Sequence, residues 1–92
     1  MELSEIREHL DRLDNAMLIL LAERMSLIPK VAEYKVKNGM PLKQPERETQ
    51  IFAAKCELAR KNNLDEEFVK SIYKIIIEES LRIEEKVKDS AK

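Results

Sequence analysis

The sequence contains one glycine, three prolines and no tryptophan, so few of its residues support sharp turns. The residues that dominate instead are Leu, Ile, Glu, Lys, Arg and Ala, most of which are good helix formers. A chain with so few turn-forming residues has room for only a few short connections. The composition therefore predicts an all-α protein.

Other scarce features exclude whole classes of protein. The single cysteine, Cys56, cannot form an internal disulfide, and it fits a reducing cytoplasm. Lys and Arg (17) nearly balance Asp and Glu (18), so no field of one sign points to nucleic acid or to an anionic membrane. No stretch approaches the ~18 apolar residues of a membrane span, and no signal-peptide pattern is present. We expect a cytoplasmic protein with no nucleic-acid or membrane partner.

The chain of 92 residues is long enough for one domain, residues 1–92. Hydrophobic spacing and helix-end signals predict three helices, over residues 4–37, 45–61 and 65–88. Gly39 provides a C-terminal stop for the first helix, and Pro41 prevents it from resuming. Pro45 fits the first turn of the second helix, and Asp65 fits the N-cap of the third.

The first predicted helix carries an apolar seam, Leu3 to Tyr34, whose positions are spaced alternately three and four residues apart. A helix of some 34 residues is about 50 Å long, and the two shorter helices cannot cover all of it. The simplest partner for the uncovered part is a second copy, so we expect a homodimer of packed long helices. Pro29 interrupts this helix and should bend it, because proline cannot donate to the Met25 carbonyl.

Polar residues lie on or beside the packing face of each predicted helix. Arg24 is the one charged residue along the seam of the first, and its burial requires a partner. Lys35 follows eleven residues later, about 20° away on the same face, so both cations face one groove. Ser80 and Glu84 are i,i+4 neighbours on the third helix, and Glu48 shares an apolar face of the second.

These residues support two interpretations, and the pattern alone leaves both open. In the first, Arg24 and Lys35 are paired internally with Glu48 and Glu84. In the second, the groove is a pocket for a small anion, because several cations can orient a polyanionic ligand. Arg7 lies 17 residues before Arg24, about 25 Å along the helix. It could serve such a pocket only from another protomer, and it is otherwise an ordinary solvated arginine.

Four segments carry a resemblance to a known family: IREHLDRLD (6–14), LLAERMSLIPKVAEYK (20–35), QPERE (44–48) and IIIEES (75–80). In this order and spacing they resemble the all-helical chorismate mutases of the AroQ class, over roughly residues 3–84. The resemblance implies an intertwined homodimer of three-helix protomers, with two sites shared between the chains. It also implies an isomerase that rearranges chorismate to prephenate, on the shikimate route to phenylalanine and tyrosine. This pericyclic reaction needs no cofactor, metal or nucleophile.

The resemblance further implies roles for individual residues. Arg24, together with Arg7 of the partner subunit, would bind the two carboxylates of chorismate. Lys35 would donate to the ether oxygen of the breaking C–O bond, with Glu84 opposite it. The other substrate-binding residues would be Gln44, Arg47, Glu48, which would accept from the ring hydroxyl, and Ser80, which would assist a carboxylate.

Three departures from the family pattern affect these expectations, and one of them is Pro29 within the long helix. Asp is common where this chain has Gln44, which is a poorer helix cap. Glu84 stands where many members carry Gln, and an ionised carboxylate there would repel the developing oxyanion. Glu84 must therefore be protonated to donate a hydrogen bond, and we expect activity to fall as pH rises.

Two alternative functions follow from the same residues. One is a related reaction on the same fold, such as that of an isochorismate pyruvate lyase, which also uses a basic pocket. The other is a non-catalytic helical dimerisation module, in which Arg24 and Lys35 would be paired internally.

Overall fold

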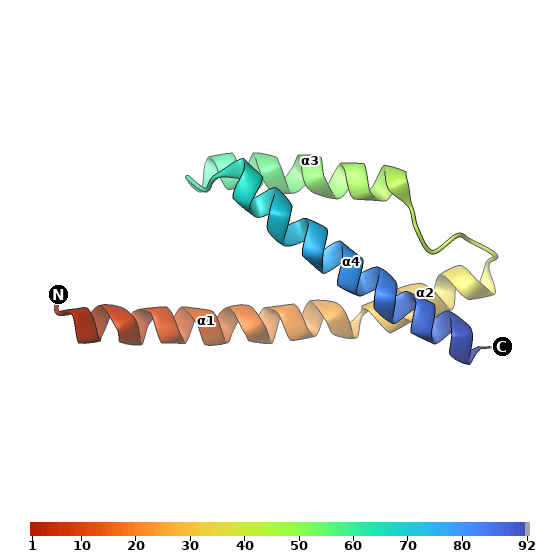
Figure 1. Cartoon of the computed structure of the whole chain (residues 1–92), viewed down its shortest axis with the longest axis horizontal. Helices are drawn as coiled ribbons and strands as arrows, with labels where there is room; N and C mark the ends of the chain where they lie inside the picture. The colour runs from red at the N-terminus through yellow and green to blue at the C-terminus, as the bar shows by residue number, and fades with distance from the viewer. Residues whose placement is uncertain (92) are drawn as a thin grey trace.

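The computed structural model describes residues 1–91 and is all-helical, with no strand in that range (Figure 1). Its four helical segments are α1 (Leu3–Ser26), α2 (Ile28–Lys37), α3 (Pro45–Lys61) and α4 (Glu66–Ser90). Segments α1 and α2 follow each other almost in line and form one long arm, which α4 crosses at α2 (Figure 1). The all-α fold expected from the composition is confirmed.

The long helix predicted over residues 4–37 is divided at Leu27. Pro29 lies in the first turn of α2, where a helix needs no backbone donor. The Leu27 N–H donates three residues back, to the Arg24 carbonyl, at 3.2 Å, and the regular i→i−4 pattern resumes when Val31 donates to Leu27 at 3.2 Å. The bend expected at Pro29 is therefore present as an interruption at Leu27, because the missing N–H of the proline allows one helical segment to end and another to begin almost in line with it.

The ends of the helices follow the local signals in the sequence. Gly39 closes α2 with φ +62°, and the Met40 N–H donates to the Lys35 carbonyl at 2.8 Å, as in a Schellman motif. Asn63 closes α3 in the same left-handed conformation, with φ 57°. Asp65 caps α4 by accepting from the backbone N–H three residues on, at 3.2 Å.

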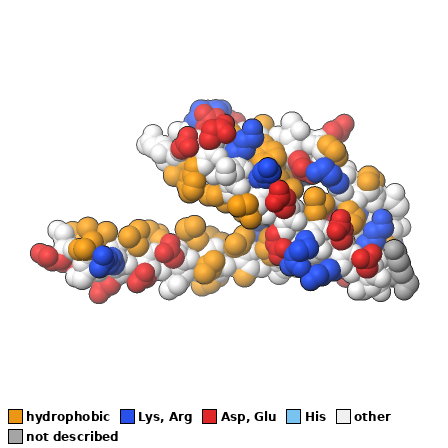
Figure 2. Space-filling model, in the orientation of Figure 1, with side chains coloured by type: hydrophobic (Ala, Val, Ile, Leu, Met, Phe, Trp, Pro, Cys, Tyr) orange, Lys and Arg blue, Asp and Glu red, His pale blue; other side chains and the backbone are white. Residues whose placement is uncertain are grey.

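The core of the single chain is small. Helix α4 packs against α2 on one side and α3 on the other, and Ala32, Ala59, Val69 and Ile77 are the buried apolar residues. Helix α1 contributes no buried residue. The apolar residues of its seam are 40–64% exposed: Leu3, Ile6, Leu10, Leu13, Met17 and Leu20. Hydrophobic side chains, drawn in orange, run along this arm in Figure 2.

The helices of this fold were also compared with the requirements of a membrane-spanning helix. Within residues 1–91, no helix combines the length and the apolar character that crossing a bilayer requires.

Candidate active site

A cavity of about 320 Å³ opens between the end of α1, α2, the start of α3 and the second half of α4. Apolar side chains supply much of its wall, among them Leu27, Val31, Ile51 and Ile77. Every site residue expected from the sequence except Arg7 also lines it: Arg24, Lys35, Gln44, Arg47, Glu48, Ser80 and Glu84. The fold thus brings together polar residues that are up to 60 positions apart in the chain.

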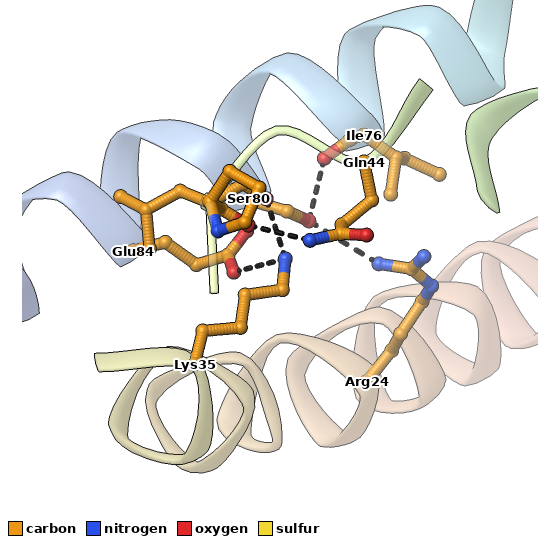
Figure 3. Close-up of polar contacts among 8 residues, drawn as sticks. Arg24, Lys35, Gln44, Ile76, Ser80 and Glu84 are labelled. Carbon is orange, nitrogen blue, oxygen red and sulfur yellow. Dashed lines mark hydrogen bonds and ion pairs between the residues drawn. The ribbon is translucent and has the colours of Figure 1, made fainter. Parts of the chain in front are cut away.

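Lys35 and Glu84 form the most buried ion pair of the cavity wall. The Lys35 ammonium donates to the Glu84 carboxylate at 2.8 Å, and the two side chains are only 13% and 5% exposed (Figure 3). The same ammonium donates to the backbone carbonyl of Leu42 at 2.5 Å. A lysine ammonium has three N–H donors, so one remains for a further acceptor.

Arg24 has a different environment. Its guanidinium donates to the Ser80 hydroxyl at 3.3 Å, and Ser80 itself donates to the Ile76 carbonyl at 2.8 Å (Figure 3). The guanidinium also lies 3.8 Å from the Met25 sulfur. Among the residues that the structure describes, no carboxylate pairs with Arg24. The internal network that would pair both cations with Glu48 and Glu84 is therefore wrong for Arg24, although Lys35 does pair with Glu84.

Glu48 and Arg47 stand at the start of α3. Glu48 is paired with Lys43, whose ammonium lies 3.0 and 3.2 Å from the two carboxylate oxygens. Arg47 is exposed and lines the cavity, and within residues 1–91 its guanidinium has no hydrogen-bond or ion-pair partner. Two arginines without a carboxylate partner, Arg24 and Arg47, therefore border one partly apolar cavity.

Gln44 occupies the N-cap position of α3 but does not cap it with its side chain. Its amide nitrogen donates instead to the Pro41 carbonyl at 2.6 Å. The weak capping expected for glutamine is confirmed. The side-chain amide instead makes a hydrogen bond within the loop that precedes the helix.

One carboxyl group of α4, that of Glu79, has a shifted pKa, but it does not line the cavity. The hydrogen bond from Arg82 lowers the pKa of Glu79 below its ordinary value, and Glu79 raises the pKa of Arg82. This pair is on the exposed side of α4, where solvent screens it.

The sequence matches the family model described as chorismate mutase type II over residues 6–85. The chain belongs to that family. The chorismate mutase of Methanocaldococcus jannaschii is 43% identical over 77 residues, which cover 84% of this chain and 78% of that protein. The 4-amino-4-deoxychorismate mutase of Streptomyces venezuelae is 35% identical, and the match covers 94% of this chain and 84% of that protein.

One of the relatives is a longer protein, and this chain aligns with only part of it. The bifunctional chorismate mutase/prephenate dehydratase of Aquifex aeolicus is 37% identical, over 95% of this chain and 25% of that protein. The chain therefore spans about a quarter of that bifunctional relative.

Arg7 is the one predicted site residue of this type II chorismate mutase family member that does not line the cavity. It is exposed on the arm formed by α1, about 25 Å along the helix from Arg24. The sequence also missed two contacts, those of the Leu42 carbonyl and of Lys43. A backbone carbonyl carries no signal in the side-chain pattern, and a lysine in a loop looks like any solvated cation.

Proposed function

We propose that this protein catalyses the rearrangement of chorismate to prephenate. One observation carries the proposal: Arg24 and Arg47 border the cavity, and neither has a carboxylate partner within the described residues. A half-buried arginine without a counter-ion is costly unless a ligand supplies the charge. A small dianion such as chorismate supplies it, and arginine recognises carboxylates through paired N–H donors.

The cavity suits a reaction that depends on how the substrate is positioned and needs no nucleophile from the protein. Its volume of about 320 Å³ lies at the lower end of the range usual for small-molecule sites. A pericyclic rearrangement requires the substrate to be held in its folded, reactive conformer, which is a proximity effect. It also requires stabilisation of the negative charge that grows on the ether oxygen as the C–O bond breaks.

The residues of the cavity divide these tasks between them. Arg24, oriented by Ser80, binds one carboxylate of the substrate. The free N–H of Lys35 donates to the ether oxygen, and Glu84, which accepts from that ammonium at 2.8 Å, holds it in place. Glu48, held by Lys43, accepts from the ring hydroxyl.

Arg47 completes this set of charges at the opening of the cavity. It is exposed there and adds positive charge that attracts the dianion.

The active form in this proposal is an intertwined homodimer. The exposed apolar seam of α1 supports it, because a long helix with no buried residue is unstable as a free arm in water. Residues 16–22, AMLILLA, are apolar on every side of the helix, which is typical of a segment surrounded by other helices. The paired arms bring Arg7 of the partner subunit to the second carboxylate of the substrate.

The proposal is tested by following the loss of chorismate and the appearance of prephenate with purified protein. Turnover is expected for the wild type, and Arg24→Ala should lower kcat/KM by at least about 100-fold while the protein stays folded. The lyase alternative is tested in parallel with isochorismate, whose conversion to pyruvate and salicylate is not expected. Absence of chorismate turnover, with a stability gain in Arg24→Met, would instead favour the non-catalytic module.

A further inference from the structure

The loop between α2 and α3, residues 38–44, forms part of the cavity wall. It makes hydrogen bonds with both the backbone carbonyl and the side-chain ammonium of Lys35. Its Met40 N–H donates to the Lys35 backbone carbonyl at 2.8 Å. Its Leu42 carbonyl accepts from the Lys35 ammonium at 2.5 Å. The path of this loop therefore sets where the ammonium can lie.

Two acceptors from different elements fix the direction of the Lys35 ammonium. One is the Leu42 carbonyl of the loop, and the other is the Glu84 carboxylate of α4, at 2.8 Å. Because two of its three N–H groups are occupied, the direction of the third is fixed. Lys35 lines the cavity, so this third N–H is available to a ligand there. Loss of either acceptor would let the ammonium rotate, because a lysine side chain is flexible.

Gln44 fixes the loop segment that carries the Leu42 carbonyl. Its amide nitrogen donates to the Pro41 carbonyl at 2.6 Å, which closes a short ring around Leu42. Figure 3 shows the amide nitrogen of Gln44 turned towards the end of the cavity where Lys35 meets Glu84. Pro41 further restricts this segment through its fixed φ angle.

We propose that Gln44 is a positioning residue for Lys35. Its amide holds the loop so that the Leu42 carbonyl meets the ammonium, and the third N–H of Lys35 is thereby aimed into the cavity. The inference rests on the proposed function in one respect, that Lys35 donates to the ether oxygen. It requires a donor at position 44, and an ionised carboxylate cannot donate to the Pro41 carbonyl.

The kinetic test replaces Gln44 by Met, which has a similar length and no donor. Net loss of one neutral hydrogen bond corresponds to about a five-fold change, so kcat should fall about five-fold while KM changes less than about two-fold. The matched control is Gln50→Met, the same substitution at an exposed position of α3, which should leave kcat and KM unchanged. Circular dichroism and Tm verify folding of each variant. A raised KM with unchanged kcat would mean that Gln44 binds substrate directly, and would overturn the proposal.

A second measurement is independent of activity. Nitrogen-15 NMR of lysine ammonium groups in the substrate-free protein should show a slowly exchanging Lys35 signal, assigned by its loss in Lys35→Arg. The signal should broaden or disappear in Gln44→Met and persist in Gln50→Met. Gln44→Glu at neutral pH serves as a second variant if Gln44→Met does not fold, and should behave like it. A signal unchanged by both Gln44 substitutions would overturn the positioning role. A lost signal with no turnover by the wild type would refute the proposed function alone.

Discussion

Lys35 on α2 and Glu84 on α4 meet at 2.8 Å in the wall of the cavity, although 49 positions separate them in the chain. Glu84 is only 4% exposed, so solvent does little to screen its charge. The same contact that orients Lys35 thus puts a carboxyl group next to the atom on which negative charge develops in the proposed reaction.

The first prediction concerns the charge of this carboxyl group. A carboxylate beside the ether oxygen repels the negative charge that grows there, whereas an amide can donate a hydrogen bond to it and still accept from Lys35. Glu84→Gln should therefore raise kcat, by about two- to ten-fold, measured as the loss of chorismate. Glu85→Gln, at an exposed neighbouring position of α4, should leave kcat unchanged. A kcat that falls in Glu84→Gln would mean that the charged contact with Lys35 outweighs the repulsion.

The second prediction tests whether a site is shared between subunits. Arg7→Ala and Arg24→Ala should each lower activity strongly when assayed alone. An equimolar mixture, unfolded and refolded together, should recover about a quarter of the wild-type activity, because half of the dimers are mixed and one of their two sites is intact. Recovery near zero, with mixed dimers shown by native mass spectrometry, would show that the two arginines do not share a site across the subunits. Full activity of Arg7→Ala on its own would remove Arg7 from the site.

The third prediction concerns the exposed seam of α1. Leu13→Lys places a charge on the seam and should convert the dimer to a monomer near 10.8 kDa, with loss of helix and of activity. Asn15→Lys, on the opposite side of the same helix, should retain the dimer. Sedimentation equilibrium measures both. A wild-type protein that is monomeric and well folded at micromolar concentration would be incompatible with the proposed assembly.

The fourth prediction concerns Pro29, which lies between the two cations. Pro29→Ala permits a continuous helix, and because Pro29 lies in the first turn of α2 the free energy of unfolding should change by no more than about 1 kcal/mol. The direction of Arg24 relative to Lys35 should change with it, and kcat/KM should fall about two- to ten-fold. Lys30→Ala, an exposed neighbour, should affect neither quantity. Unchanged kinetics in Pro29→Ala would limit Pro29 to a role in packing.

Part of the site could be predicted from the sequence because helical periodicity is a local rule. The spacing of Arg24 and Lys35 placed them on one groove, and the spacing of Ser80 and Glu84 placed both on the packing face of α4; the structure confirms that all four line one cavity. The division at Leu27 was not predicted in position, because the proline indicated only a bend.

The choice of ion-pair partners could not be predicted in the same way. Glu48 and Glu84 were equivalent candidates for two cations, yet Glu84 pairs with Lys35 and Glu48 with Lys43. That choice depends on the path of the loop over residues 38–44, which places the Leu42 carbonyl against Lys35 and the Lys43 ammonium against Glu48.

The sequence by itself determined the helices, most of their ends, and the side of each helix on which the polar residues lie. These properties depend on interactions within about four residues of the chain, which the local sequence specifies. Only the tertiary structure decided that Arg24 remains without a carboxylate among the described residues while Lys35 is held from two sides. That outcome depends on how α4 crosses α2 and where the loop runs, since hydrogen bonds form only between groups that the fold brings within about 3 Å.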